Sequence, residues 1–339
     1  MMRIARSLAL AASILMALNI SSPALAQTEL SEKASIRSIL TAVVDHDSLV
    51  DTDFVGDAAN VETDVDAVNA IEARVNGTDV VIPSSIVAPI SVGDRDQILT
   101  IGRPELTAVE TVELAPGAIA HTSNEGVTTI SAVNSDGSVQ IGTIIDNSSA
   151  PSRFDFELGL PHGGSIYELN GQIFVLDAAG ELVGGFAPAW AKDANGLDVP
   201  TQYEVSGSTL TQFVDHDRPG VVYPVVADPA YARGMISQVK WERWRNGGWE
   251  VRLTVTALAR WTQPINPGFV YSAGLADLRE HHPSSMQYKT MAQQWDCHVA
   301  GLPGTINIDL ESYRRSWDNW RAGIIPAILQ GNPAKACNW

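Results

Sequence analysis

The spacing of apolar positions near the start of the chain is helical and then gives way to an acidic stretch. In SEKASIRSILTAVV the apolar side chains recur every three or four residues, at Ile36, Ile39, Leu40, Val43 and Val44. The run DHDSLVDTDFVGDAANVETDVD follows, with many carboxylates and no Lys or Arg. Residues 27–75 are therefore predicted to form an acidic segment that is partly helical or disordered.

Short apolar runs separated by turn residues characterise the chain from residue 76 to residue 229. Asn-Gly pairs between alternating runs are a strong hairpin signal, and closely spaced strands with such turns are typical of antiparallel β proteins. The segment is therefore predicted to be a β-rich module, either a sandwich or a barrel. The stretch VVYPVVADP is expected to be its last strand, which Pro224 restricts to an edge or a strand start. The turns are at 134–137, 170–171, 179–180, 195–196, 206–207 and 218–220.

Strand-like and helix-like patterns are mixed after residue 230. From Val251 to Trp261, apolar positions alternate with Arg and Thr, which predicts a strand with one buried and one basic face. The stretches AGLADLREHH and SSMQYKTMAQQWDCHVAG predict helices, and INIDLESYRR predicts a final strand. Residues 230–339 are therefore predicted to form a small α+β domain. The absence of a βαβ pattern argues against a doubly wound nucleotide-binding fold.

Charge and tryptophan content both change near residue 230, which supports a domain boundary there. Residues 27–229 contain 8 Lys and Arg against 31 Asp and Glu, whereas residues 230–339 contain 12 against 8. Eight of the nine tryptophans lie from Trp241 onward. A chain with a net charge of −17 repels phosphate backbones, so nucleic acid is not an expected partner.

The first 26 residues have the pattern of a secretory signal peptide. Arg3 and Arg6 precede an apolar run over residues 8–18, and Ala24 and Ala26 provide the small residues that signal peptidase reads. The run is too short to span about 30 Å of hydrocarbon, and no later stretch is long and apolar enough to do so. The chain is therefore expected to be cleaved after Ala26 and secreted, as an extracellular or loosely cell-wall-associated protein.

Secretion guides the interpretation of the two cysteines, Cys297 and Cys337. In an oxidising compartment, two lone cysteines are expected to form a disulfide. The bridge would close a loop of about 40 residues, contribute roughly 4 kcal/mol and hold the C-terminus in place. A catalytic thiol would instead need a nearby base, and sequence neighbours such as Cys297 and His298 do not face each other on a helix or strand.

Two parts of the chain resemble known sequence families. The elements Ala-Trp-Ala at 189–191, Asp-Ala-Asn-Gly at 193–196, Val-Pro-Thr-x-Tyr at 199–203 and Tyr-Pro-Val-Val-Ala-Asp-Pro at 223–229 resemble a β-rich module of secreted actinobacterial proteins. The elements GGWEVRLTVTALAR, QQWDCHVAG, IDLESYRR and the terminal CNW resemble a C-terminal domain of unknown function in such proteins. These resemblances imply export, a disulfide and a two-domain layout, and they imply no activity.

Familiar catalytic motifs are missing from the sequence, which contains no Gly-x-Ser-x-Gly, no His-Glu-x-x-His and no Gly-x-x-x-x-Gly-Lys. A hydrolytic site would have to be built around His298 as a general base, with Asp296 and Glu311 as carboxylates. The alternative is that His298 is a structural residue of a small disulfide-linked domain. No cofactor is predicted, and bridged cysteines exclude a thiolate metal site.

Tryptophans and arginines near the C-terminus are the candidate ligand-binding residues. Flat aromatic side chains can stack on sugar rings, and guanidinium groups suit anionic polymers such as teichoic acids. Trp317 and Trp320, with Arg314 and Arg321, are predicted to be the exposed binding group. The alternative is that these tryptophans pack in the core of the domain, because a small domain gains much from each buried indole.

One stretch, DTDFVGDAANVE, resembles a calcium loop of the EF-hand type. Asp51, Asp53 and Glu62 fall at ligand positions of such a loop, whereas Val55 stands where an oxygen ligand is needed. The preferred interpretation is a solvated acidic linker, so no metal is predicted. If the protein does bind calcium, this loop is where we expect the ion.

Three functions are compatible with these features. The preferred hypothesis is a non-enzymatic secreted protein that binds the cell envelope, through a cell-wall glycan or another surface polymer. The alternative is a secreted hydrolase with a site around His298, and a toxin with a C-terminal effector has no residue-level support. The first hypothesis predicts Trp and Arg side chains on one exposed face, and the second predicts a pocket where His298 meets a carboxylate.

Overall fold

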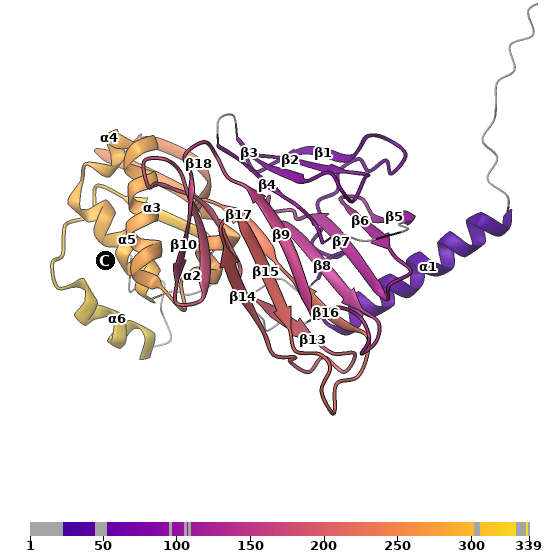
Figure 1. Ribbon diagram of the computed structural model, residues 1–339. Helices are drawn as coiled ribbons and strands as arrows, with labels where there is room; N and C mark the ends of the chain where they lie inside the picture. Colours follow the sequence, from indigo (N-terminus) through magenta and orange to yellow (C-terminus); the bar gives the residue numbers. More distant parts are fainter. Residues whose placement is uncertain are drawn as a thin grey trace, which may run out of the picture.

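Antiparallel β-structure dominates the computed structural model, which describes residues 23–44, 53–94, 97–104, 107, 110–301, 306–329 and 337. Helices are concentrated in the C-terminal part (Figure 1). The predicted fold class, a mainly β part followed by a small α+β part with one disulfide, is confirmed.

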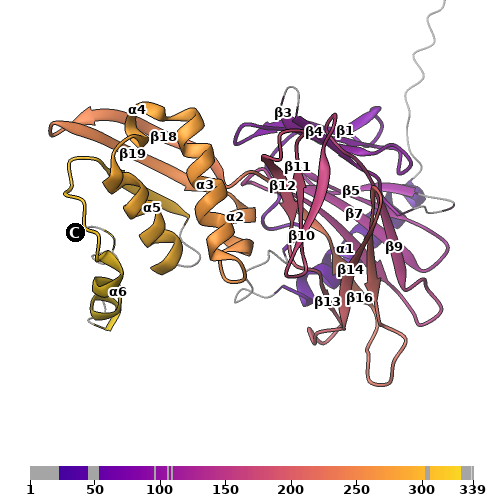
Figure 2. The ribbon, with the colours of Figure 1, turned by 60° about the vertical axis from the view of Figure 1, so that its left-hand side comes forward.

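Two large sheets face each other in the β-rich part (Figures 1 and 2). Apolar side chains from both sheets meet in one core, for example Ile82 and Phe156 from the first sheet and Ile141 and Phe186 from the second. This arrangement is that of a sandwich. The first sheet has the order β1 (Asn69–Val75), β2 (Thr78–Pro83), β3 (Ile90–Asp94), β4 (Gln97–Ile101), β9 (Arg153–Gly159), β15 (Thr209–Val214), β14 (Thr201–Ser206).

The second sheet is longer and carries a short side branch. Its two central strands, β7 and β8, are buried along their whole length. The order is β10 (Ser165–Leu169), β11 (Gln172–Leu176), β12 (Leu182–Phe186), β17 (Ala230–Arg233), β8 (Val139–Ile145), β7 (Val127–Val133), β6 (Ala118–Thr122), β5 (Glu110–Ala115), with β16 (Val225–Asp228) beside β8 and β13 (Trp190–Lys192) beside β16.

Helix α1 (Pro23–Ala42) explains the burial of β7 and β8 on both faces. Ile36 and Leu40 of this helix pack with Phe54 against the side of the second sheet that faces away from the sandwich core. Gly142 in β8 makes room for the Phe54 ring, because a Cβ there would collide with it. The predicted helix is therefore confirmed. In the described part of the acidic run, Phe54 is fully buried against the sheet, whereas Asp57, Glu62, Asp64 and Asp66 are exposed to solvent.

The β-rich part begins and ends at other residues than those predicted. It begins at Asn69, because β1 pairs with β2 across a turn at Asn76 and Gly77, both with positive φ. It ends at Arg233, because β17 still pairs with β12 and β8. Boundaries at 76 and 229 would therefore each separate a strand from its partners. Pro224 lies immediately before β16, at a strand start as predicted.

The C-terminal part is a three-stranded antiparallel sheet with helices packed on one side (Figure 2). The predicted strand from Val251 to Trp261 is wrong beyond Val255. Thr256 accepts a hydrogen bond from the Ala259 N–H and caps a helix there, in a segment rich in strong helix formers. The elements are β18 (Ile236–Arg245), β19 (Gly248–Val255), α2 (Ala257–Thr262), α3 (Pro267–His281), α4 (Pro283–Met286), α5 (Lys289–Gly301), β20 (Asn307–Glu311) and α6 (Trp320–Leu329).

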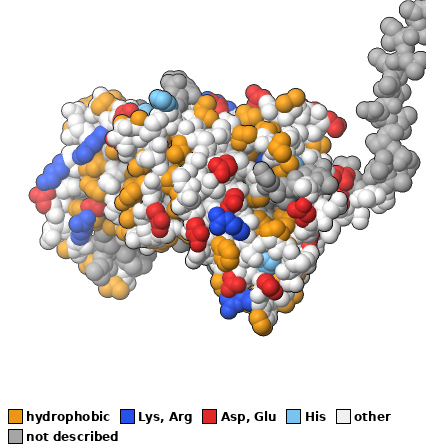
Figure 3. All heavy atoms as spheres, in the orientation of Figure 1, with side chains coloured by type: hydrophobic (Ala, Val, Ile, Leu, Met, Phe, Trp, Pro, Cys, Tyr) orange, Lys and Arg blue, Asp and Glu red, His pale blue; other side chains and the backbone are white. Residues whose placement is uncertain are grey.

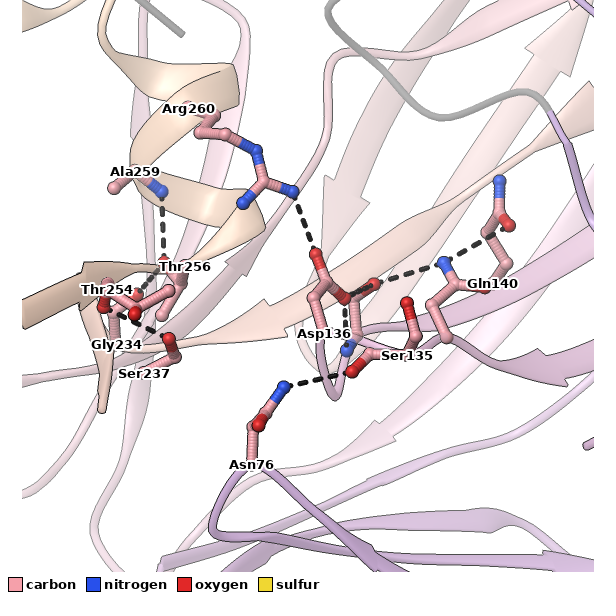
Figure 4. A network of polar contacts seen from close by, with 12 residues as sticks. Asn76, Ser135, Asp136, Gln140, Gly234, Ser237, Thr254, Thr256, Ala259 and Arg260 are labelled. Carbon is pink, nitrogen blue, oxygen red and sulfur yellow. Dashed lines mark hydrogen bonds and ion pairs between the residues drawn. The ribbon is translucent and has the colours of Figure 1, made fainter. Parts of the chain in front are cut away.

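The two parts of the protein are joined by both apolar and polar contacts. Phe174 and Ala232 of the second sheet share a hydrophobic cluster with Leu258 of α2. Arg260 of α2 donates to Asp136 in the turn between β7 and β8 at 2.8 Å (Figure 4). The C-terminal part is therefore anchored on the edge of the sandwich by α2.

Two further predictions concern the ends of the chain. Most of the predicted signal peptide lies outside the described residues, which start at Pro23 within α1. In the part of the chain that the structure describes, no helix combines the length and the apolar character needed to cross a membrane. The predicted disulfide between Cys297 and Cys337 is present and links α5 to the C-terminal end.

Candidate functional site

His298, the predicted general base, is enclosed within the C-terminal part. Only 6% of its surface is exposed, and neither ring nitrogen has a hydrogen-bond partner among the described residues. The adjacent cavity has a volume of about 10 Å³ and is lined mainly by apolar side chains such as Val255, Trp295 and Ile308. A space of that size holds one water molecule at most. Burial lowers the pKa of His298 to about 4, so the ring is neutral at pH 7.

The carboxylates predicted to accompany His298 are engaged elsewhere. Asp296 accepts a hydrogen bond from Arg321 at 2.7 Å on the surface of α5. Glu311, at the end of β20, is paired with Arg314. Within the described residues, His298 and these carboxylates therefore do not meet at a pocket, and the arrangement that a hydrolase requires is not formed.

The predicted exposed tryptophan pair is only partly exposed. Trp320 is 4% exposed, and the guanidinium carbon of Arg321 lies 4.9 Å from the centre of its ring. Trp317 is half-buried, and its backbone N–H donates to Gln293 at 3.0 Å. The prediction of an exposed pair is wrong for Trp320, because its ring is used to pack the start of α6. Arg314 and Arg321 are held by the carboxylates described above.

The calcium candidate is split between residues inside and outside the described range. Asp51 lies outside it. Asp53 accepts hydrogen bonds from the backbone N–H groups of Val55 and Gly56, which closes a turn. Glu62 is exposed in the chain that leads to β1, so a strand rather than a helix follows the loop. Nowhere in the described ranges do three or more His, Cys, Asp or Glu side chains gather to hold a metal ion.

Arginine and tryptophan side chains gather instead on the β18–β19 hairpin, which sequence reasoning missed. The register places Trp241 opposite Arg252 and Arg243 opposite Glu250, so these four side chains share the outer face of the sheet. The opposite face carries buried residues such as Val251 and packs on the helices. We name the group Trp241, Arg243, Trp244, Arg245, Trp249 and Arg252 the aromatic–arginine hairpin.

Two guanidinium groups are positioned by the Trp241 ring on the outer face. The guanidinium carbons of Arg243 and Arg252 lie 4.3 and 5.5 Å from the ring centre, within the range of a cation–π contact. Arg252 also donates two hydrogen bonds of 2.6 Å to Asp309 on β20. The hydrogen bonds and charge of Asp309 raise the pKa of Arg252 further. The arginines are therefore both charged and fixed in direction.

The tip of the hairpin is its most exposed portion. Trp244 is 57% exposed, and its ring lies 5.7 Å from that of Trp249 at an angle of 88°. Arg243 and Arg245 both pair with the single carboxylate of Glu250, at 3.1 and 3.3 Å. One positive charge therefore remains uncompensated within this group of three, on the face of the hairpin opposite to Trp244 and Trp249. The sequence signal was the run WERWRNGGW, which places three tryptophans around an Asn-Gly turn.

A groove of about 1090 Å³ lies between the two parts. Its carboxylates are partly paired: Asp136 with Arg260 at 2.8 Å, and Asp277 with His281 at 3.0 Å. Burial raises the pKa of Asp277. The charged residues that line the groove are mainly carboxylates, whereas the hairpin presents three arginines to two carboxylates on an outward face, so we place the candidate site on the hairpin. The charged residues lining the groove are Arg74, Asp94, Asp136, Asp177, Glu181, Arg233, Asp277 and Glu280.

Comparison of the chain with protein families, with curated proteins and with solved structures found no match.

Proposed function

We propose that the protein is a secreted, non-enzymatic binding protein that attaches to an anionic polymer of the cell envelope or of another cell surface. The aromatic–arginine hairpin would be the contact. The observation that carries the proposal is the pair Arg243 and Arg245, which share the carboxylate of Glu250 on the outer face of a hairpin whose tip also exposes Trp244 on the other face. An indole stacks on the flat face of a sugar ring, and a guanidinium group pairs with phosphate or carboxylate in a bidentate manner.

The distribution of charge supports an orientation toward such a polymer. Lys and Arg exceed Asp and Glu only after residue 230, and Figure 3 shows blue side chains at the C-terminal end on the left. An anionic polymer attracts this end and repels the acidic sandwich. The protein would therefore approach the surface with the hairpin first and keep the β-rich part away from it.

The hydrolase alternative has less support from the geometry. A general base must reach the proton that it removes, and His298 is buried next to a cavity that is too small for a substrate. Among the residues that the structure describes, neither ring nitrogen has a hydrogen-bond partner, and Asp309, whose charge acts on the ring, is bound to Arg252. Binding without turnover is therefore the function that the described side chains favour.

Co-sedimentation with purified cell walls tests the proposal. We expect saturable pelleting that weakens as salt increases, because exposed charges are screened. We also expect weaker pelleting with walls from which the anionic polymers have been removed, and no glycan fragments in the supernatant. Fragments released in proportion to the protein would show a hydrolase instead. Pelleting that is independent of both salt and anionic polymer would contradict the proposal.

A pair of matched variants assigns the binding to the hairpin. Trp244→Ala combined with Arg245→Ala removes an exposed indole and a guanidinium, and should weaken binding roughly tenfold. Phe213→Ala combined with Arg153→Ala is the control, because these residues are cross-strand neighbours on the first sheet and are also exposed. The control should bind like the unmodified protein. Equal loss in both variants would mean that the hairpin is not the site.

A further inference from the structure

The peptide bond between Asp228 and Pro229 lies within the sandwich, between its last two strands and shortly before the C-terminal part begins. It is the only Asp-Pro pair in the sequence, and it joins β16 to β17, both of which pair with β8. The aspartyl carboxyl can close a five-membered ring on the carbonyl carbon of its own residue. The proline nitrogen carries no hydrogen and departs as a secondary amine once it is protonated. This bond is therefore chemically distinct from all others in the chain.

The side chain of Asp228 is held so that one of its oxygens is left without a partner. The residue is fully buried, and its Oδ2 accepts hydrogen bonds from Gln140 Nε2 and Trp190 Nε1, both at 3.1 Å. Its Oδ1 has no hydrogen-bond partner, because the nearby Ile141 N–H, which helps to lower the pKa of this carboxyl, donates to the Pro229 carbonyl oxygen at 3.1 Å. A buried carboxylate oxygen without a donor is costly, so its presence calls for an explanation beyond the two hydrogen bonds of Oδ2. The free oxygen is the atom that a nucleophilic attack would use.

The carbonyl group of Asp228 has a polarising partner. The hydroxyl of Tyr203, on β14, donates to the Asp228 carbonyl oxygen at 3.3 Å. Burial, and then the charge of Asp228, raise the pKa of Tyr203 well above its usual value, so the hydroxyl remains a donor. A donor at this position stabilises negative charge that develops on the oxygen when the carbonyl carbon is attacked.

The protonation state of Asp228 is also suited to the reaction. Burial raises the pKa of this carboxyl to about 7, although the hydrogen bonds from Gln140, Trp190 and the Ile141 backbone act to lower it. The side chains that face it come from β8, β13 and β14, and no charged group contributes to the shift. Below about pH 7 the carboxyl therefore carries the proton that the leaving proline nitrogen needs.

We propose that Asp228 cleaves its own peptide bond to Pro229 in the folded protein. Oδ1 bonds to the Asp228 carbonyl carbon, and the carboxyl proton is transferred to the Pro229 nitrogen. The bond between carbon and nitrogen breaks, which leaves a cyclic anhydride on Asp228 and a secondary amine on Pro229. One water molecule then opens the anhydride into the side-chain carboxyl and a new C-terminal carboxyl.

The two products would remain associated after cleavage. β17, on the C-terminal side of the bond, pairs with β12 and β8, and β16, on the other side, pairs with β13 and β8. The disulfide between Cys297 and Cys337 lies wholly within the C-terminal product, so no covalent link would remain between the two chains. The reaction would thus convert the link between sandwich and hairpin from a covalent into a reversible one.

Intact mass measurement under denaturing conditions tests the proposal. The purified protein is incubated folded, and unfolded in urea, at about pH 5 and about pH 9, on either side of the Asp228 pKa. We expect two fragments that end at Asp228 and begin at Pro229, whose summed masses exceed the intact mass by one water. They should form faster in the folded protein than in the unfolded one, and faster at the lower pH. An intact folded chain, or equal rates in both states, would overturn the proposal.

Variants distinguish cleavage that is assisted by the folded site from the general acid sensitivity of an Asp-Pro bond. Asp228→Asn and Pro229→Ala should each abolish the fragments. Tyr203→Phe keeps the ring and removes the donor, and should slow cleavage at least tenfold without moving its pH midpoint. Circular dichroism confirms that each variant is folded. Unchanged cleavage in folded Tyr203→Phe would contradict the assigned role of the hydroxyl, and the comparison of folded with unfolded protein does not depend on any variant.

Discussion

The guanidinium carbon of Arg243 lies 4.3 Å from the centre of the Trp241 ring, on the sheet face opposite to the one that packs on the described helices. Arg252 approaches the same ring from the neighbouring strand. The indole therefore holds two positive groups that would otherwise move freely in solvent. A surface prepared in this way loses less side-chain entropy when it binds an anion.

Replacing Trp241 tests whether the ring organises the arginines. We expect Trp241→Ala to lower the free energy of unfolding by roughly 1–2 kcal/mol, since it loses two cation–π contacts at an exposed site. Polymer binding should weaken although every charge is retained, and Trp241→Phe should recover part of both losses. Urea denaturation and a binding titration measure the two effects. Binding that depends only on the number of arginines would argue against this role for the ring.

The pH dependence of stability tests whether His298 is a buried structural residue rather than a catalytic base. Its folded-state pKa of about 4 lies below the ordinary value of 6.5, so unfolding takes up a proton as the pH falls between these values. Stability should be full above pH 6.5 and should decline toward pH 4, by up to roughly 3 kcal/mol from this group. His298→Leu should raise stability by roughly 1 kcal/mol at pH 7 and reduce the decline. The remaining decline would come from buried His121, whose pKa is also about 4.

The outcome for His298→Leu is read by thermal unfolding over a series of pH values. A folded variant that is less stable than the unmodified protein at every pH would mean that the ring makes a contact essential to the domain.

The disulfide should stabilise the C-terminal part selectively. Cys297 and Cys337 are 40 residues apart, which corresponds to roughly 4 kcal/mol in the chain-entropy model. Cys297→Ser with Cys337→Ser should therefore increase hydrogen exchange in α5 and β20 while leaving the sandwich strands protected. Hydrogen exchange read by mass spectrometry distinguishes these regions. Equal loss of protection in β7 and β8 would show that the two parts unfold as one unit.

The contact between Gly142 and Phe54 can be examined with a double-mutant cycle. Gly142→Ala places a methyl group against the Phe54 ring and should destabilise the protein by roughly 2–3 kcal/mol. In a Phe54→Ala background the same change should cost much less, because the ring is gone. Chemical denaturation of the four proteins gives the coupling energy. Additive effects would mean that the segment containing Phe54 is not packed on β8.

Turn chemistry made much of the sandwich predictable from the sequence. Asn170 and Gly171 form the β10–β11 turn and both have positive φ, as Asn-Gly hairpins require. The position of β1 was missed because its residues follow an acidic run and alternate only weakly. The order of the strands could not be predicted either, since β17 lies between β12 and β8 and its pairing joins residues far apart in sequence.

The candidate site was harder to predict than the fold, because exposure is decided by tertiary packing. Trp320 and Trp244 stand in similar sequences, each next to an arginine and three residues from another tryptophan. One begins a helix and is buried, whereas the other lies near a hairpin tip beyond the reach of the helices. The spacing of tryptophan and arginine in one sequence therefore does not distinguish the buried Trp320 from the exposed Trp244.

A tryptophan-fluorescence titration with a soluble phosphate-bearing glycan tests the central claim most directly. Exposed indoles such as Trp244 report contact with the polymer, and repeating the titration at high salt measures the charge contribution. We predict saturable binding that weakens with salt, is absent with an uncharged glycan of similar size, and is about tenfold weaker in Trp244→Ala with Arg245→Ala. Equal affinity for charged and uncharged glycans, or full affinity in that variant, would contradict the assignment of the hairpin as the binding surface.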